Sequence, residues 1–259
     1  MDLGIAGRTA IVCASSRGLG LACAEALAAE GVSLVLNGRD AASLDRTVAE
    51  LAATHGVEVV GVVADLDTEE GRSLLLAACP DPDILITNNG GPPPAAFVDV
   101  TADAWQSALS ANMLSAIGLV QQVLPGMRRR GFGRIINITS AMVKSPNALM
   151  TPSIAARTGL TGVMKAISRE VACDNVTINN LLPERIDTGR QRQMAELAVA
   201  LRGITIDEAY AEIAATIPAG RLGLPDEVGA ACAFLCSVLA SFITGQNVSL
   251  DGGAYEGVF

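Results

Sequence analysis

Short apolar runs alternate along the chain with longer segments in which apolar residues recur every three or four positions. Runs rich in Val, Ile and Leu that are closed by Gly, Asn or Asp are typical of strands buried on both faces of a parallel sheet, and the longer pattern is typical of amphipathic helices. We expect strands at 8–14, 32–36, 57–64, 83–87, 135–139, 176–182 and 246–250, and helices at 18–29, 41–54, 68–78, 101–130, 152–173 and 225–239. This alternation predicts an α/β fold, doubly wound around a seven-stranded parallel sheet with helices on both faces.

The chain has 259 residues, which is enough for one α/β domain with a large core. No linker, repeat or low-complexity tract divides it, so we expect a single domain over 1–259. The segment 184–220 differs from the rest because its helical patterns are polar and weakly periodic. We expect this segment to form a lid over the substrate site.

Composition narrows the possible partners and the compartment. The net charge of −9, from 27 acidic and 18 basic residues, disfavours nucleic acid or an anionic membrane as a main partner. We find no apolar run long enough to span a bilayer and no secretory signal at the N-terminus, so we expect a cytoplasmic protein without a membrane partner. The six cysteines contain no Cys-x-x-Cys pair and the only histidine is His55, so we expect buried thiols in a reducing compartment and no metal site.

A glycine-containing loop follows the first expected strand. Its residues are Ser15, Ser16, Arg17, Gly18, Leu19 and Gly20, and the next helix begins within it. The two glycines allow the backbone to approach a pyrophosphate, which the N-terminus of a helix attracts. The loop therefore predicts a dinucleotide site, and its position after an N-terminal strand strengthens that prediction.

The end of the second expected strand indicates which dinucleotide binds. An acidic residue there would hydrogen-bond the adenine ribose hydroxyls and repel a 2′-phosphate. The chain instead has Asn37, Gly38 and Arg39, with no acid before Asp40. Together with Arg17, Arg39 offers two guanidinium groups to a ribose phosphate. We therefore expect NADP(H) to be bound in preference to NAD(H).

The stretch 134–169 brings polar side chains to the carboxyl end of a central strand. The strand ends in Ser140, and the polar loop that follows contains Lys144. The next helix carries Ser153 and Arg157, which share one face because they are four residues apart. Open parallel sheets bind their ligands at the carboxyl ends of the strands, so these side chains are candidates for the chemistry.

This stretch closely resembles the catalytic segment of the short-chain dehydrogenase/reductase family. In that family a serine at the strand end is followed thirteen residues later by tyrosine and four residues after that by lysine, and the same count from Ser140 reaches Ser153 and Arg157. The resemblance covers nearly all of the chain. It is closest to the 3-oxoacyl-[acyl-carrier-protein] reductase-like branch, from which this chain diverges in its catalytic tetrad, and it implies a single NAD(P)-binding Rossmann domain.

The resemblance also implies a set of cofactor contacts. Besides the residues from Ser15 to Gly20, they would be Asn37, Arg39, Asp65, Leu66, Asn89, Gly90, Gly91, Arg157, Pro183, Ile186 and Thr188. Cys13 and Ala14 replace the Thr-Gly of the family's phosphate loop, Gly90 replaces an Ala, and Glu184 replaces a Gly. Ala14 adds a methyl group where the backbone has to turn tightly.

In the family a tyrosine gives a proton to the substrate carbonyl oxygen, and a lysine lowers the tyrosine pKa and holds the nicotinamide ribose. Asn112 matches the asparagine that holds a relay water, and Ser140 matches the serine that hydrogen-bonds the oxygen. Ser153 is a far weaker acid than tyrosine, and Arg157 can still donate to the ribose but cannot release a proton at neutral pH. Lys144 is either a substitute that stabilises a developing alkoxide or a solvent-exposed loop residue.

The resemblance implies an NADP(H)-dependent oxidoreductase that reduces a β-ketoacyl group or a small ketone, or oxidises the matching alcohol. Two alternatives stay open: a catalytically silent NADP(H)-binding protein, and a non-redox lyase or isomerase on the same scaffold. The expected partners are a small-molecule or acyl-thioester substrate and further copies of the chain. The family forms tetramers through the helices at 102–130 and 152–173, so we expect a homotetramer or a homodimer.

Overall fold

The structure, a computed structural model, describes residues 1–258 and is built around one seven-stranded parallel sheet. The strands are β1 Thr9–Val12, β2 Ser33–Gly38, β3 Val59–Val63, β4 Ile84–Thr87, β5 Gly133–Ile138, β6 Val176–Pro183 and β7 Asn247–Leu250. They lie in the order β3-β2-β1-β4-β5-β6-β7, so the direction of winding reverses between β1 and β4. This order confirms the doubly wound fold, and its switch point is where such sheets bind their ligands.

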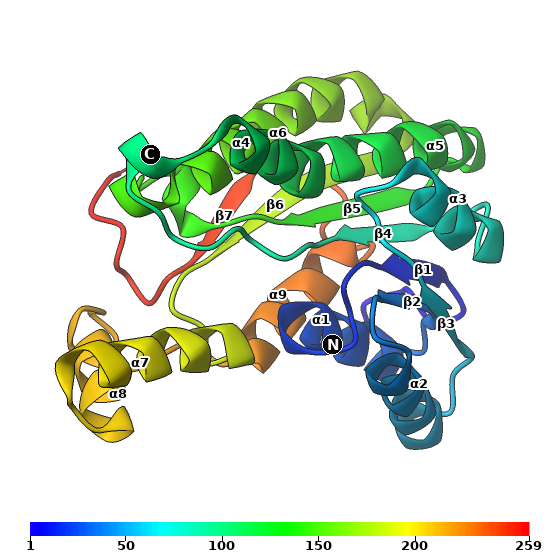
Figure 1. Cartoon of the computed structure of the whole chain (residues 1–259). Helices are drawn as coiled ribbons and strands as arrows, with labels where there is room; N and C mark the ends of the chain where they lie inside the picture. The colour runs from blue at the N-terminus through cyan, green and yellow to red at the C-terminus, as the bar shows by residue number, and fades with distance from the viewer. Residues whose placement is uncertain (259) are drawn as a thin grey trace.

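Helices cover both faces of the sheet, as Figure 1 shows. The helices are α1 Gly18–Ala29, α2 Ala41–His55, α3 Glu69–Ala78, α4 Ala102–Leu109, α5 Ser115–Arg130, α6 Thr151–Val171, α7 Gly189–Arg202, α8 Ile206–Ala215 and α9 Pro225–Cys236. α1, α2 and α9 lie on one face, and α3 to α6 lie on the other. Successive residues of one strand serve the two cores, since Ile84 and Ile86 pack on the first side and Leu85 on the second. Burial on both sides explains the continuous apolar runs in the sequence.

The helix expected over 101–130 is interrupted. A π-helical turn, Ser110–Leu114, separates α4 from α5, and Asn112 lies buried within it. By length and composition alone the combined helix Ala102–Arg130 could cross a membrane, contrary to the expectation of no spanning apolar run. It packs on the sheet here, and 44% of its most apolar window is buried inside the protein.

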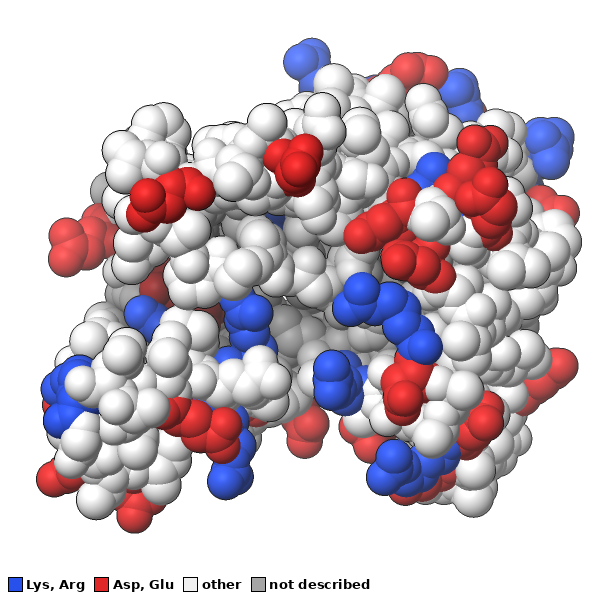
Figure 2. All heavy atoms as spheres, viewed as in Figure 1, with Lys and Arg blue, Asp and Glu red and all other residues white. Residues whose placement is uncertain are grey.

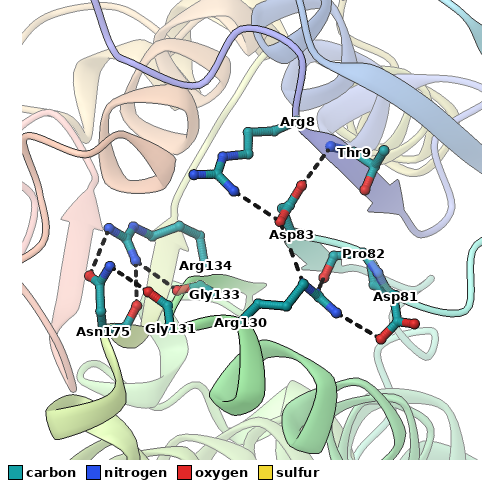
Figure 3. Close-up of polar contacts among 10 residues, drawn as sticks. All are labelled: Arg8, Thr9, Asp81, Pro82, Asp83, Arg130, Gly131, Gly133, Arg134 and Asn175. Atoms are coloured by element: carbon teal, nitrogen blue, oxygen red, sulfur yellow. Dashed lines mark hydrogen bonds and ion pairs between the residues drawn. The ribbon is translucent and has the colours of Figure 1, made fainter.

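The amino-terminal edge of the sheet, away from the site described below, is held by charged groups (Figure 3). Asp83 accepts hydrogen bonds from Arg8 at 3.2 Å and from the backbone N–H of Thr9 at 3.2 Å. The side chain of Arg134 is only 1% exposed and donates to backbone carbonyls, among them that of Asn175 at 2.9 Å. These contacts join the starts of β1, β4, β5 and β6.

A ladder of polar side chains crosses the sheet near its carboxyl edge. Thr87 donates to Asn137 at 2.7 Å, and Asn137 donates to Asn180 at 2.9 Å. Asn180 in turn donates to Asn247 at 2.8 Å. Each pair is also in direct register on neighbouring strands, so the ladder links β4, β5, β6 and β7.

The thiols follow the expectation only in part. Cys13, Cys23, Cys232 and Cys236 are buried, and Cys79 is half-buried. Cys173 is exposed, so the expectation of a buried thiol is wrong there. The reason is local, because Cys173 lies in the 3-10 turn Ala172–Asp174 that follows α6 at the surface.

Candidate active site

The candidate site lies at the carboxyl ends of the central strands, beneath the lobe formed by α7 and α8. Figure 1 shows this lobe standing away from the sheet, connected to it through the end of β6. Figure 2 shows a hollow between the lobe and the body, with Lys and Arg side chains on both of its sides. The segment 184–220, expected to be a lid, forms this lobe.

The phosphate loop leaves room for a pyrophosphate. α1 begins after Arg17 without a side-chain cap, so its first N–H groups have no side-chain acceptor at that end. Gly18 has φ +62° and a side chain there would meet no atom within 4 Å, whereas a Cβ on Gly20 would collide with the carbonyl of Ala14. An open, uncapped helix N-terminus fits the diphosphate of a dinucleotide, which Arg17 and the backbone from Gly18 to Gly20 would contact.

Ser15 and Ala14 shape the loop. The Ser15 hydroxyl is fully buried, donates to the carbonyl of Val12 at 2.8 Å and accepts from the backbone N–H of Asn37 at 3.1 Å. Ala14 adopts φ 45°, in the left-handed region that favours glycine. Ala14 therefore makes the tight turn expected of the glycine that it replaces, and its Cβ strains the backbone there.

At the end of β2 the structure separates a supporting residue from two exposed cations. The buried amide of Asn37 accepts from the N–H of Ala14 at 3.2 Å and donates to the carbonyl of Ala64 at 3.0 Å, so this side chain supports the loop. Arg17 and Arg39 are exposed. Asp40, the nearest acid, caps α2 by accepting from the N–H of Ser43 at 2.8 Å.

The neighbours of Asp40 keep its carboxylate in the charged form. Hydrogen bonds from Ser43 and the charges of Arg17 and Arg46 keep the pKa of Asp40 below its ordinary value. Since its carboxylate is engaged at the start of α2, it does not take the place of the ribose-binding acid of NAD(H)-dependent sites.

The end of β4 forms another wall of the candidate site. The Asn89 side chain donates to Asp67 at 2.9 Å and to the carbonyl of Ala111 at 3.1 Å, which ties this strand end to the loop after β3 and to the π-helical turn. A Cβ on Gly90 would meet no atom within 4 Å. Of the two expected cofactor contacts after β3, Leu66 is buried and Asp65 is exposed.

Arg157 is the most connected side chain of the site. It donates from Nε to the Ser153 hydroxyl at 3.2 Å, from Nη1 to the carbonyls of Ile138 and Thr139 at 2.9 Å each, and from Nη2 to Oδ1 of Asn112 at 2.7 Å. These bonds use four of the five N–H groups of a guanidinium. Burial, and to a smaller extent the charge of Arg190, lower the pKa of Arg157 to about 10, so it stays a cation at neutral pH.

Asn112 completes this arrangement from the π-helical turn. Its amide donates to the carbonyl of Gly90 at 3.2 Å while its Oδ1 accepts from Arg157. A small cavity of about 20 Å³ lies beside it and is also lined by Asn88, Ser115 and Arg157. This space, with polar side chains at part of its otherwise apolar lining, suits a single water molecule.

Ser140 and Ser153 are both at the positions that the sequence predicted, with different surroundings. Oγ of Ser140 is half-buried and accepts from the N–H of Met142 at 3.2 Å, which leaves its hydroxyl hydrogen to donate elsewhere. Ser153 is 4% exposed and its oxygen accepts from Arg157. The serine that replaces tyrosine is therefore bonded to the arginine that replaces lysine.

The structure places Lys144 away from this group. Its ammonium donates to the Ser249 hydroxyl at 3.3 Å and lies 5.2 Å from the centre of the Tyr255 ring. Lys144 is thus engaged with the carboxyl end of β7 and the segment after it.

Arg190 was missed in the sequence analysis. It lies in the first turn of α7, two residues after the expected contact residue Thr188, and its Nη2 donates to the carbonyl of Pro92 at 3.0 Å. A cation at the start of a helix opposes the helix dipole, and that placement was the available signal. Two further expected cofactor contacts lie just before α7. Pro183 is the last residue of β6, and Ile186 forms an isolated parallel bridge with Gly223.

A tyrosine in the lobe does not replace the missing one. The hydroxyl of Tyr210 donates to Asp187 at 3.2 Å, beside a cavity of about 500 Å³ between α7 and α8. Desolvation and the bond to Asp187 raise the pKa of Tyr210 above its ordinary value. It is therefore a weaker acid than a free phenol.

Comparison with known proteins shows what the chain is related to. Residues 13–255 match a family model described as enoyl-(acyl carrier protein) reductase. Dehydrogenase/reductase SDR family member 4 of Oryctolagus cuniculus is 33% identical, over 96% of this chain and 94% of the relative. The chain belongs to the short-chain dehydrogenase/reductase family. The 3-oxoacyl-[acyl-carrier-protein] reductase of Aquifex aeolicus is 30% identical over 98% of this chain and all of the relative, which supports the branch that was expected.

A solved structure gives the same result for the fold. The L-sorbose reductase of Gluconobacter frateurii, in complex with NADPH and L-sorbose, has a TM-score of 0.95, 29% identity and full coverage of both chains. The short-chain dehydrogenase/reductase chain described here therefore has the Rossmann-like architecture that its alternating pattern predicted.

Proposed function

We propose that this protein is an NADP(H)-dependent oxidoreductase that reduces the carbonyl of a small ketone or a β-ketoacyl thioester, or oxidises the matching alcohol. One observation carries the proposal: the uncapped N-terminus of α1 opens beside Arg17 and Arg39, while the nearest acid is engaged as a helix cap. The NADPH complex of the similar L-sorbose reductase supports NADP(H) in preference to NAD(H).

NADPH, when bound, supplies a hydride to the carbonyl carbon. Ser140 would donate a hydrogen bond from its hydroxyl to the substrate oxygen. Its oxygen already accepts from the N–H of Met142, so the hydroxyl hydrogen is the part that stays available. Asn112 and Arg157 would hold a water in the cavity between them, within the wall of the site. Arg157 keeps one N–H for the nicotinamide ribose, so most of its bonding serves to position Asn112 and Ser153.

The family's tyrosine is replaced by Ser153, and the loss of its phenol as a proton donor determines the rate of carbonyl reduction that we expect. General acid catalysis is worth about 10²–10⁴-fold, so we expect slow turnover that depends on orientation and on the Ser140 hydrogen bond. The ammonium of Lys144 is held by Ser249 at the end of β7, so we assign it the smaller role in stabilising an alkoxide.

The second candidate is a silent NADP(H)-binding protein. The observation in its favour is the commitment of Arg157 to four protein acceptors, which is what a structural replacement of the catalytic lysine would show. Binding of the cofactor would then change conformation or assembly without chemistry.

The test is stopped-flow loss of NADPH absorbance with a panel of ketones and β-ketoacyl thioesters. Slow turnover of at least one compound supports the reductase, and micromolar NADPH binding without turnover supports the silent protein. In the double variant S153Y/R157K we expect about a 10²–10⁴-fold gain, because both lost groups return. Circular dichroism and NADPH affinity of the double variant establish that it has folded.

We also propose a homotetramer or homodimer. Phe242 is fully exposed (101%), and Phe234, Val238 and Leu239 are exposed near it, close to the edge strand β7. On α6 the small residues Ala155, Gly162 and Ala166 are exposed, which permits close helix approach. Sedimentation velocity tests the assembly, and a monomer mass would contradict it.

A further inference from the structure

Two guanidinium groups meet on either side of the loop after β4. A Cβ built on Gly91 would lie 3.7 Å from Nη2 of Arg157. Nη2 of Arg190 donates to the carbonyl of the next residue, Pro92, at 3.0 Å, although the two residues are 98 positions apart in the chain. Arg157 comes from the catalytic helix α6 and Arg190 from the first turn of the lid helix α7.

Neither cation has an acidic partner within the described residues 1–258. Six other arginines do, namely Arg8, Arg128, Arg130, Arg192, Arg202 and Arg221. The two charges affect each other, since Arg190 helps to lower the pKa of Arg157. An acidic protein of net charge −9 thus keeps two uncompensated cations in one part of its cleft.

Helix stability does not explain Arg190. A cation in the first turn of a helix is disfavoured by the helix dipole. Among residues 1–258 the Arg190 guanidinium donates only to the backbone carbonyl of Pro92, and that bond is weaker than the two-pronged pair that a carboxylate can accept. An anionic group that entered beside Gly91 would relieve the repulsion and replace this bond.

We propose that Arg190 binds a carboxylate of the substrate, aided by the nearby positive charge of Arg157, so that the preferred substrates are oxo acids rather than neutral ketones. This inference rests on the proposed reductase function. A cofactor phosphate offers the same anionic oxygens, but the diphosphate has its own cradle at Gly18 and Gly20, with Arg17. Arg190 instead lies close enough to Arg157 for the two charges to repel, and Arg157 is bonded to Ser153, beside which the reacting carbonyl would lie.

The experiment compares each acid with its methyl ester, which removes the charge and keeps the ketone. Pyruvate, acetoacetate and levulinate and their methyl esters are reduced with NADPH by the native protein, by Arg190→Gln and by Arg202→Gln. The last variant makes the same charge change at the far end of α7, where Arg202 pairs with Glu212. For Arg190→Gln we expect kcat/KM on the acids to fall about 10- to 100-fold, mainly through KM, and on the esters less than about 3-fold.

Calorimetry of NADPH binding separates the two sources of the anion. The substrate inference requires an unchanged Kd for NADPH in Arg190→Gln. A Kd weakened about 10-fold, with the acid-to-ester ratio unchanged, would assign Arg190 to a cofactor phosphate and overturn the inference. Equal losses on acids and esters would also overturn it.

Failure of the reductase function is distinguishable from failure of the anion site. If no compound is reduced, saturation-transfer difference NMR with the NADP⁺-loaded protein compares levulinate with methyl levulinate. Signals for levulinate that disappear in Arg190→Gln and persist in Arg202→Gln uphold the carboxylate site while the reductase proposal falls. Signals that are equal in all three proteins overturn the site as well.

Discussion

Nη2 of Arg157 donates a 2.7 Å hydrogen bond to Oδ1 of Asn112, so the residue in the place of the family's lysine holds the residue of the π-helical turn. Through the same guanidinium, α6 is joined to the end of β5 and to the end of β4 beyond Asn112. The arginine therefore has a structural role that a lysine cannot fully replace.

Replacement of Arg157 by Lys alone should lower the free energy of unfolding by about 1–3 kcal/mol. One ammonium cannot reach all four acceptors in the planar arrangement of a guanidinium, and an unsatisfied buried acceptor is costly. Urea unfolding measures the change. Arg129→Lys on the exposed end of α5 is the control, and equal stability of the two variants would contradict the structural role.

Arg39→Ala should weaken NADPH binding about 10-fold and leave NADH binding nearly unchanged. The reason is that the guanidinium of Arg39, directly after β2, would bind the 2′-phosphate, which NADH lacks. Calorimetric titration with both cofactors gives the ratio. The exposed Arg169 of α6, changed to Ala, controls for loss of charge alone. Parallel losses for the two cofactors would remove Arg39 from the phosphate site.

Ala14→Gly should raise the free energy of unfolding by about 0.5–1 kcal/mol. Ala14 holds φ 45°, and a Cβ in the left-handed region costs about 1–2 kcal/mol, which the greater freedom of an unfolded glycine partly offsets. Ala49→Gly, at an exposed position of α2, should instead lower stability by about 1 kcal/mol. Both changes are read from denaturant midpoints, and destabilisation by Ala14→Gly would mean that the turn is unstrained.

Alkaline pH should destabilise the protein through Cys13. Burial raises the pKa of this thiol from 9.0 to about 12, against a smaller opposing effect of a hydrogen bond from Asn88. The unfolded chain therefore loses the proton near pH 9 while the folded chain keeps it. The stability from this group is complete below pH 9 and is lost as pH rises towards 12, by about 1.4 kcal/mol per unit.

The check is unfolding of the native protein and of Cys13→Ala at pH 8 and pH 10.5. The native protein should lose more stability over this interval than the variant. Part of the loss will remain in the variant, because the pKa of buried Cys232 is also raised. Identical losses in both proteins would show that the Cys13 thiol titrates normally when folded.

The fold could be predicted from the sequence because parallel strands buried on both faces must be apolar throughout, as Ile84 to Ile86 are. The positions of Ser140, Ser153 and Arg157 followed from spacing, since a strand end and one helix face determine them. The direction of Lys144 did not, because its partner Ser249 lies 105 residues away. The contact of Arg190 with Pro92 could not be predicted for the same reason, since the two residues are 98 positions apart. The π-helical turn Ser110–Leu114 could not be predicted either, because it leaves no periodic pattern in the sequence.

The ladder from Thr87 to Asn247 has a consequence for assembly of the sheet. Strands that are apolar on both faces specify their register only weakly, because a valine or isoleucine packs against almost any apolar neighbour when one strand is shifted along the other. A slip of one residue that brought Leu181 opposite Asn137 would separate Asn137 from Asn180 and bury amide groups without partners. The asparagines thus favour the native strand register, because shifted pairings that the hydrophobic side chains alone would tolerate leave buried amide groups unpaired.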